Sequence, residues 1–438
     1  MTTRDHDHCT FIPPWLAERV AAGQLAADRE LRAARASADR SVRAVVAADA
    51  AAWTVHDAGS TTRLPGALAR SAGESATGDP AVDEAADGVT ATLEMWAQGF
   101  GRDSFDGAGA PVSLTVHYGS AYDNAFWDGT QLVFGDGDGR VFDRFTKPVD
   151  VLAHEFGHAV VEHTCDLAYE GQSGALNESV ADAFASCLKQ RVLDQDAAAG
   201  DWLIGQGIFL PSVQARALRD MAAPGTAYDD PDLGADPQVG HMDDYVDTTD
   251  DNGGVHLNSG IPNKAFQLAA VAIGGSAVEG AGRIWYAALT GGGVPSTADF
   301  AQFAAATVAA AGDHADAVAQ AWAQVGVEPS AAGGPVRPAP VGSSARTLRV
   351  ERTGGFAGRT ESAEVDLDDP AVADLRGLVA AAGIDTLRPP ADPTPKPDMF
   401  VYGFRVDGGD LVRVPEHLLT GAQAEVARRV LRSGGGVS

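Results

Sequence analysis

The sequence is poor in cysteine and in long hydrophobic runs. Its 438 residues include three cysteines, Cys9, Cys165 and Cys187, which are scattered along the chain. A small secreted domain held by a disulfide framework would need more of them, so no such framework is expected. No apolar run approaches the length of a membrane span. No charged start is followed by an apolar stretch, so we also expect no secretory signal peptide of the usual kind.

Positive charge is scarce as well. The chain has 32 Lys and Arg residues against 60 Asp and Glu residues, which gives a net charge of −28 at pH 7. Phosphate backbones and anionic lipids repel such a chain, so neither nucleic acid nor a membrane is an expected partner. Together with the lack of a signal peptide, this composition predicts synthesis and residence in the cytoplasm, or export by an unconventional route. We expect a monomer.

What is present is a helix-compatible stretch that carries two histidines. His154 and His158 lie four residues apart, with Glu155 between them. On a helix, residues at this spacing share one face, so both rings can bind one metal ion. Neutral imidazoles are typical zinc ligands, and Glu155 is left free to act as a base. From this motif alone, a surface helix with two histidines stays open as the alternative.

A second helical run supplies the missing ligand. A catalytic zinc site has three protein ligands and keeps one position for water. Glu178 and Asp182 are again four residues apart, inside an apolar periodic run from Ala175 to Leu188. We expect Glu178 to reach the metal and Asp182 to accept the second N–H of a ligating histidine, which fixes the ring. A helix-surface acid is the alternative for Asp182.

A third segment places one more histidine after an acidic, Gly-rich turn. His256 follows Gly253 and Gly254 and precedes the apolar run Ile261–Ile273, so we expect it at the mouth of that helix. Asp251 lies five residues before His256, close enough to orient its ring. An imidazole held in this way can hydrogen-bond an oxyanion. The alternative is a structural histidine.

These segments together resemble a known family. The sequences HEFGH (154–158), GALNESVAD (174–182) and DNGGVHLNSGIPNKAF (251–266) have the order and spacing found in thermolysin-type neutral metalloendopeptidases. Asp123–Gly129 and Val133–Gly139 are similar to that family's substrate-edge strand and following hairpin. The resemblance runs from about Leu64 to about Val327. The start of the chain, Cys9–Leu16, is similar to the short propeptide of the protealysin-type branch.

The resemblance implies a role for each matching residue at the metal. His154, His158 and Glu178 are the ligands of one catalytic Zn²⁺. Glu155 is the general base and later the proton shuttle, and Asp182 orients His154. The expected reaction is hydrolysis of a peptide bond by a zinc-activated water.

The resemblance also implies the residues that bind the substrate. Tyr169 and His256, with Asp251 behind His256, stabilise the oxyanion. The remaining expected contacts are Asn124 and the Ala125 backbone for the main chain, Arg219 for a substrate carbonyl, and an apolar pocket of Phe142, Val151 and Leu218. Such a pocket predicts cleavage on the amino side of bulky apolar residues.

One departure from the family concerns calcium. The best-known members carry a calcium cluster beside the active-site helices. Here Asp150 and Asp201 remain, but Lys189 and Gln206 occupy positions where the family has acids. Because Ca²⁺ needs six to eight oxygen ligands, the site is weakened. We expect the Lys189 ammonium to replace the cation and pair with Asp150 or Asp201. A solvated lysine is the alternative. The loop Asp136–Gly139 is expected to be a turn rather than a calcium loop.

The predicted fold class is α+β. We expect a two-lobed thermolysin-like peptidase, with a mixed β-rich N-terminal lobe, a helical C-terminal lobe and the zinc helix between them, followed by a small α+β domain. The expected boundaries are a propeptide at 1–55, the N-terminal lobe with the zinc helix at 56–164, the helical lobe at 165–328, a Pro- and Gly-rich linker at 329–345 and the last domain at 346–438. That last domain resembles emfourin, an inhibitor of thermolysin-type peptidases, through the segment Arg352–Gly358 and the order of its elements.

The predicted function is a zinc endopeptidase, made as a latent precursor and held in check in cis by its C-terminal domain. Cys9 can serve as a thiolate ligand that caps the metal, or it can be incidental. One alternative is a regulatory or binding protein whose peptidase part is a scaffold for inhibitor-like surfaces. Another is a metallohydrolase that acts on a non-peptide. Both leave the occupied catalytic and substrate-strand positions unexplained.

Overall fold

A computed structural model describes residues 10–20, 52–331, 347–354, 359–367, 400–407, 411–415 and 421–433, with isolated positions between 375 and 419. The chain divides into two compact units, Met1–Gly334 and Pro335–Ser438, which are described separately. Within the described ranges, no helix combines the length and the apolar character that crossing a bilayer requires.

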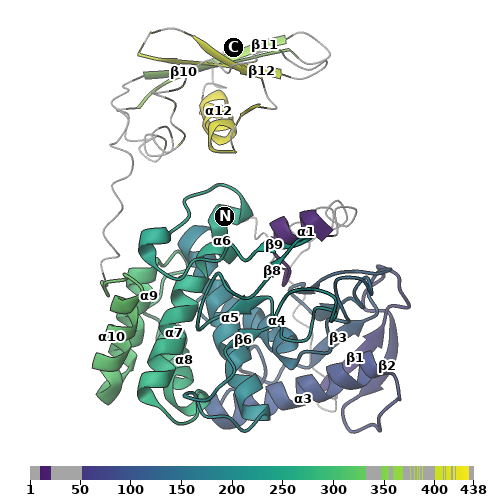
Figure 1. The fold of residues 1–438 in the computed structure, drawn as a ribbon. Coiled ribbons are helices and arrows are strands. Elements are labelled where there is room, and N and C mark those ends of the chain that lie inside the picture. Colours follow the sequence, from purple (N-terminus) through teal and green to yellow (C-terminus); the bar gives the residue numbers. More distant parts are fainter. Residues whose placement is uncertain are drawn as a thin grey trace. The chain divides into compact units, whose positions relative to one another are not determined.

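One mixed sheet forms the centre of the N-terminal lobe (Figure 1). Its strand order is β2-β1-β3-β5-β4, with β1, β3 and β5 parallel and the two outer strands antiparallel to their neighbours. Strand β4 is the last strand at one edge of this sheet, so its outer side has no neighbouring strand among the described residues. The strands span Trp53–Asp57 (β1), Ala67–Ser71 (β2), Val112–Val116 (β3), Ala125–Trp127 (β4) and Leu132–Phe134 (β5).

Helix α3, Pro80–Phe100, packs against β1 and β3. It begins after Asp79, whose side chain accepts hydrogen bonds from the backbone N–H groups of Ala81 and Val82, with a proline in the first turn. It ends at Gly101, which takes the left-handed conformation with φ 64° that glycine tolerates best. Both ends of the helix are therefore determined by local sequence.

Helices α4, Val149–Glu162, and α5, Gly171–Val192, pack against each other and carry the zinc motifs. Helix α4 is buried along nearly its whole length. A Cβ at Gly157 would lie 2.8 Å from the Cα of Ala181, so only glycine permits this close approach. The approach brings the histidine face of α4 against the acidic face of α5.

The second lobe is mostly helical. Its core includes a run of aromatic rings, with Trp285 stacked on Trp322 at 6.1 Å and Phe266 edge-on to Trp285 at 5.1 Å. The helical elements are α6 Asp251–Asn258, α7 Gly260–Ile273, the π-helical turn η2 Val278–Gly282, α8 Arg283–Thr290, α9 Phe300–Ala310 and α10 Ala315–Gln324. Short antiparallel pairs connect α5 to this lobe: β6 Leu203–Ile204 with β7 Arg219–Asp220, and β8 Asp229–Asp230 with β9 Gly234–Ala235.

The Asp136–Gly139 loop uses its acids within the protein, as expected for a turn. Asp138 accepts hydrogen bonds from the backbone N–H groups of residues 140–142 at 2.8–3.1 Å. Both carboxylate oxygens of Asp136 lie 2.9 Å from His117 Nδ1. The hydrogen bond to Asp136 raises the pKa of His117 to about 9 although burial opposes it. The loop is thereby fixed beside the β4–β5 hairpin.

The described residues of the C-terminal unit include an antiparallel sheet and helix α12. The strands pair in the order β11-β10-β12-β13, and the helix packs its apolar face on β10 and β11. The elements are β10 Thr347–Gly354, β11 Arg359–Asp366, β12 Phe400–Val406, β13 Val412–Pro415 and α12 Gly421–Ser433. The expected linker lies mostly outside the described residues, and residues 355–358 of the emfourin-like segment lie outside them as well. The sequence also predicts a helix over Val372–Ala382, of which only isolated positions are described.

Apolar residues at helical spacing predict helices between Leu16 and Ala52, over Ala277–Leu289 and over Glu416–Leu431, and the structure describes parts of each with shifted ends. The helix predicted over Ala277–Leu289 is divided into η2 and α8, because Gly280 leaves helical conformation (φ −90°, ψ −105°). The helix predicted over Glu416–Leu431 begins only at Gly421. Of the helices predicted between Leu16 and Ala52, the structure describes α1, Pro14–Val20; residues 21–51 lie outside the described ranges.

Candidate active site

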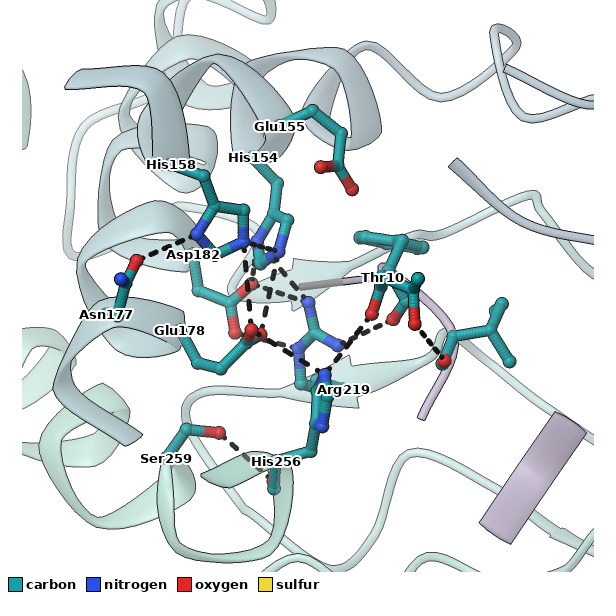
Figure 2. Close-up of polar contacts among 12 residues, drawn as sticks. Thr10, His154, Glu155, His158, Asn177, Glu178, Asp182, Arg219, His256 and Ser259 are labelled. Carbon is teal, nitrogen blue, oxygen red and sulfur yellow. Dashed lines mark hydrogen bonds and ion pairs between the residues drawn. The ribbon is translucent and has the colours of Figure 1, made fainter. Parts of the chain in front are cut away.

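Three predicted ligands converge between α4 and α5. One ligand atom from each of His154, His158 and Glu178 lies within 4.8 Å of the other two, and all three residues are buried. The two Nε2 atoms are 2.9 Å apart, and the Glu178 carboxylate oxygens lie 3.6 and 3.7 Å from them. Two imidazole nitrogens and one carboxylate, with no fourth His, Cys, Asp or Glu ligand among the described residues, match the donor set of a catalytic zinc site. Figure 2 shows the three side chains pointing toward one another.

Both ligand rings are held through their other nitrogen. His154 Nδ1 lies 2.8 Å from Asp182 Oδ1, and His158 Nδ1 lies 2.8 Å from Asn177 Oδ1. Because each Nδ1–H donates to an oxygen, each Nε2 carries a lone pair directed at the metal position. Asp182 is in turn bound by both Arg219 Nε and Nη2 at 2.7 Å and by Asn263 Nδ2 at 2.8 Å.

The electrostatics of the site favour metal binding near neutral pH. Burial, and then the neighbouring His154, lower the pKa of His158 to about 4, so this ring is neutral and able to coordinate. Burial alone would raise the pKa of Glu178, but His256, His158 and His154 outweigh it and hold the pKa at about 2. Burial alone would also raise the pKa of Asp182. The charge of Arg219 is the main effect that outweighs burial, so the pKa of Asp182 lies well below its usual range.

Glu155 lies on the side of the site nearest the sheet edge. It is fully buried, and its Oε2 accepts a hydrogen bond from the Trp127 backbone N–H of β4 at 2.9 Å. It is not one of the three converging ligand groups. The backbone of the edge strand β4 therefore holds this carboxylate beside the metal site.

His256 is oriented by a left-handed turn at the start of α6. Residues 251–254 have φ values of 53°, 51°, 84° and 74°, which fold Asp251 back over the helix. Its carboxylate lies 2.8 Å from the His256 backbone N and 2.6 Å from Nδ1. Nε2 then faces Tyr169 OH at 3.3 Å and Glu178 Oε1 at 3.6 Å. The expected pair with Asp251 is present, but His256 lies within α6 rather than at the mouth of α7.

The residues predicted to bind the substrate main chain contact the chain's own N-terminal segment. Phe11 N–H donates to the Ala125 carbonyl at 3.0 Å, and Ile12 N–H donates to Asn124 Oδ1 at 2.9 Å. Arg219 Nη1 lies 3.4 Å from the Phe11 carbonyl oxygen. Residues 11 and 12 thus lie along the outer edge of β4, next to the metal site.

The Phe11 side chain fills a pocket beside the metal ligands. It is fully buried, with its ring edge-on to the His154 ring at 5.2 Å and 5.0 Å from Arg219 Cζ. A Cβ at Gly205 would lie 3.2 Å from Phe11 Cζ and 3.3 Å from Leu218 Cβ, so Gly205 leaves room for the ring. The other two predicted pocket residues, Phe142 and Val151, are fully buried in the same core cluster.

Lys189 is buried at the expected calcium position. Its Nζ lies 2.8 Å from Asp201 and 3.6 Å from Asp150, and it donates to Leu203 O at 3.0 Å and Gln206 Oε1 at 3.2 Å. Burial raises the pKa of Asp150, and Lys189 counteracts part of that effect. The predicted ion pairs are both present.

Sequence reasoning missed three residues that shape the site. Asn177 precedes the ligand Glu178, and an amide next to a ligand is a signal for a residue that orients a ring. Asn263 and Gly205 carry no comparable signal, because their partners Asp182 and Phe11 are distant in the sequence. Cys9 lies outside the described residues.

The fold and this site define a metallopeptidase, and comparison with known families agrees. Residues 38–162 match the catalytic domain of thermolysin metallopeptidases, and residues 165–327 match their alpha-helical domain. Residues 350–431 match the emfourin family.

Individual relatives are similar over most of the chain. An extracellular metalloprotease of Pectobacterium carotovorum is 45% identical over 73% of this chain and 96% of its own length. The protealysin precursor of Serratia proteamaculans has a solved structure with 46% identity and a TM-score of 0.66, over 73% of this chain and 99% of that one. A thermolysin of Alicyclobacillus acidocaldarius is 41% identical over 52% of this chain and 42% of its own length. The chain belongs to the thermolysin family of zinc-dependent metalloendopeptidases, and it carries a C-terminal emfourin domain. Membership of this family identifies the protein as an endopeptidase rather than a scaffold protein or a hydrolase of non-peptide substrates.

One expectation is wrong. The composition predicts cytoplasmic residence, but a relative with 45% identity is named an extracellular metalloprotease, which points to secretion. The prediction failed because net charge and a search for one kind of export signal do not identify the compartment in which a protein acts.

Proposed function

We propose that this endopeptidase cleaves on the amino side of bulky apolar residues and is made as a latent precursor. The observation that carries this proposal is the burial of Phe11 beside His154, with its carbonyl oxygen 3.4 Å from Arg219. A fully enclosed aromatic side chain marks the shape and polarity of the pocket next to the metal.

The proposed reaction is general-base hydrolysis. Bound zinc supplies an acidified water and polarises the scissile carbonyl. Glu155 takes a proton from the attacking water and passes it to the leaving amine. Its attachment to the Trp127 N–H at 2.9 Å supports this role, since it fixes the carboxylate beside the strand that binds substrate.

We assign oxyanion stabilisation to His256 and Tyr169. Both are polar groups at the edge of the metal site, 3.3 Å from each other. Asp251 fixes the His256 ring through Nδ1 at 2.6 Å, so that Nε2 is the nitrogen presented to the substrate. Because charge on the carbonyl oxygen grows only as the reaction proceeds, these donors act mainly on turnover.

We propose that Asn124, Ala125 and Arg219 form hydrogen bonds with the main chain of the substrate. A peptide added to β4 gains backbone hydrogen bonds whatever its sequence, and a side-chain pocket then supplies the preference. The apolar residues proposed for that pocket are Phe142, Val151 and Leu218.

Peptides that differ only in the residue after the scissile bond test this specificity. Enzyme freed of its N-terminal segment should give kcat/KM values about 10²-fold higher for Leu or Phe than for Gly or Asp, because the pocket buries apolar surface and leaves a carboxylate unpaired. The measurement is initial rates with a matched quenched-fluorescence set. Equal kcat/KM values for Leu and Asp would contradict the proposal.

The proposed basis of latency is occupation of the cleft by residues 10–12, within a propeptide that ends before strand β1 begins at Trp53. The contacts of Phe11 with Ala125 and Arg219, and of Ile12 with Asn124, support it, because a substrate needs the same groups.

We further propose that the C-terminal domain, residues 346–438, inhibits the peptidase in cis across the linker 329–345. The support is its match to the emfourin family. A Pro- and Gly-rich tether of this length gives an effective concentration near the millimolar range, so even a weakly binding domain stays bound most of the time.

A chain that ends at Val327 tests this proposal. With its propeptide removed, it should hydrolyse peptides about 10-fold faster than the full chain treated in the same way, if the domain binds with a Kd near 0.1 mM. Initial rates should be compared over a wide dilution series, because inhibition in cis does not weaken on dilution. Equal rates for the two chains would rule it out.

We also propose that the Lys189 ammonium replaces a calcium ion. Its four oxygen neighbours, on Asp150, Asp201, Leu203 and Gln206, are the kind of ligands that Ca²⁺ uses. A fixed cation of this kind would hold α4, α5 and the following loop together without metal.

A further inference from the structure

We propose that the Thr10–Phe11 peptide bond is this enzyme's own first substrate, which the chain hydrolyses in cis. The inference rests on the proposed roles of Glu155 and His256. It identifies the first peptide bond that is cut in the proposed latent precursor and the product that this cut leaves.

The backbone register of the N-terminal segment identifies the bond. Phe11 N–H donates to Ala125 O at 3.0 Å, which makes Phe11 the residue paired with strand β4. His256 Nε2 lies 3.2 Å from the Thr10 carbonyl oxygen (Figure 2). The carbonyl at the proposed oxyanion donor and the nitrogen at the substrate strand therefore belong to one peptide bond.

The metal site lies against that same carbonyl. The His256 nitrogen that faces Thr10 O is 3.6 Å from Glu178 Oε1 and 3.3 Å from Tyr169 OH. On the other side of the bond, the Phe11 ring packs on the ring of the ligand His154. The Thr10–Phe11 bond is thus flanked by two of the three ligands.

Glu155 is positioned to deliver a proton to the leaving nitrogen. Its carboxylate is bound by Trp127 N–H, two residues along β4 from the Ala125 carbonyl that binds Phe11 N–H. In the proposed step, a water oxygen bonds to the Thr10 carbonyl carbon and the bond to Phe11 N breaks. Both protons of the water pass through Glu155 to the Phe11 nitrogen, so the products are a carboxylate on Thr10 and an ammonium group on Phe11.

The contacts beyond Phe11 predict that this cut leaves the cleft occupied. Trp15 Nε1 donates to Tyr228 OH at 3.4 Å, Arg19 Nη1 donates to Leu233 O at 3.0 Å, and Leu16 is fully buried. All of these contacts lie on the Phe11 side of the bond. Residues 1–10 should leave, while the new N-terminus at Phe11 stays bound as a product until a later cut removes it.

Mass spectrometry of the zinc-loaded full chain tests the inference. A chain that begins at Phe11 should accumulate, together with the peptide Met1–Thr10, at a first-order rate that does not change over a 100-fold dilution. Glu155→Gln should leave the bond intact. Phe11→Leu should preserve the cut, and Phe11→Asp should slow it at least ~10-fold, since a carboxylate replaces the buried ring.

A second readout does not depend on turnover. In metal-free Glu155→Gln protein, the Phe11 and Ile12 amides should exchange with deuterium at least ~10²-fold more slowly than in the Phe11→Asp version, because their acceptors are lost when the segment leaves the cleft. Rapid exchange of both amides in Glu155→Gln protein would overturn the assigned register.

The failures can be told apart. If the protein hydrolyses added peptides while the Thr10–Phe11 bond stays intact, the inference is wrong and the proposed function stands. If neither added peptides nor this bond is cut, the proposed function fails. A rate that rises with protein concentration, or efficient cutting of Glu155→Gln chains by added wild type, means attack between molecules and overturns cleavage in cis.

Discussion

Replacing Glu155 with Gln should lower the rate of peptide hydrolysis by about 10²–10⁴-fold while the protein keeps its zinc. The amide cannot take a proton from water, but it retains the shape of the carboxylate. Its position outside the group of His154, His158 and Glu178 is the reason to expect unchanged metal content. The measurement is kcat/KM on a peptide substrate together with zinc content.

Glu162→Gln is the matched control for this variant. Glu162 lies at the end of the same helix and accepts a hydrogen bond from Trp127 Nε1 at 2.8 Å, away from the ligands. It should keep its kcat/KM within about threefold of the wild-type value, because the Trp127 indole N–H can still donate to the amide oxygen, so this hydrogen bond is weakened rather than lost. Near-normal activity in Glu155→Gln would refute the assigned base.

Replacing Lys189 with Met should lower the free energy of unfolding by about 3–5 kcal/mol, since it leaves a buried carboxylate without its charge partner. Asp150 is 1% exposed and Lys189 is 7% exposed, so water cannot compensate for the loss. The measurement is denaturant unfolding of metal-loaded protein. Lys147→Met is the matched control: Lys147 pairs with Asp143 at 2.6 Å on the surface, and such a pair is worth about 0–1 kcal/mol.

Lys189→Glu tests the calcium argument directly. The variant would offer three carboxylates, the Leu203 carbonyl and the Gln206 amide oxygen, to which water can add the remaining ligands that Ca²⁺ needs. Millimolar calcium should therefore raise the Tm of the variant but not that of the wild type. An equal rise in both proteins would count against Lys189 as the replacement for the ion.

The zinc site was predictable from sequence because its geometry is largely local. Four-residue spacing fixes His154 against His158 and Glu178 against Asp182, whatever surrounds the helices. The non-local pairs of Lys189 with Asp150 and Asp201 were predicted from the resemblance alone, because Lys189 occupies a position where the family has a calcium-binding acid. The contacts of Asn177 and Gly205 could not be assigned, because they depend on how α4, α5 and the N-terminal segment meet in space.

The limits of sequence reasoning are clearest at the turn before His256. The pattern of glycines predicts a turn, but not that Asp251 and Asn252 also take left-handed conformations. That geometry moves His256 into α6 and directs its Nε2 at the Thr10 carbonyl. Strands β1 and β2 were not predicted for a different reason: β1 pairs with the distant strand β3, and a bulge interrupts its register with β2.

The most direct test of the central claim is the zinc content of four purified chains: wild type, Glu155→Gln, Glu178→Gln and His154→Ala. The claim is that His154, His158 and Glu178 hold the single catalytic ion, while Glu155 acts on water without binding the metal. After dialysis against a weak chelator, wild type and Glu155→Gln should each retain about one zinc per chain, and the two ligand variants should retain less than about a tenth of that. Full zinc content in Glu178→Gln, or its loss in Glu155→Gln, would contradict the account.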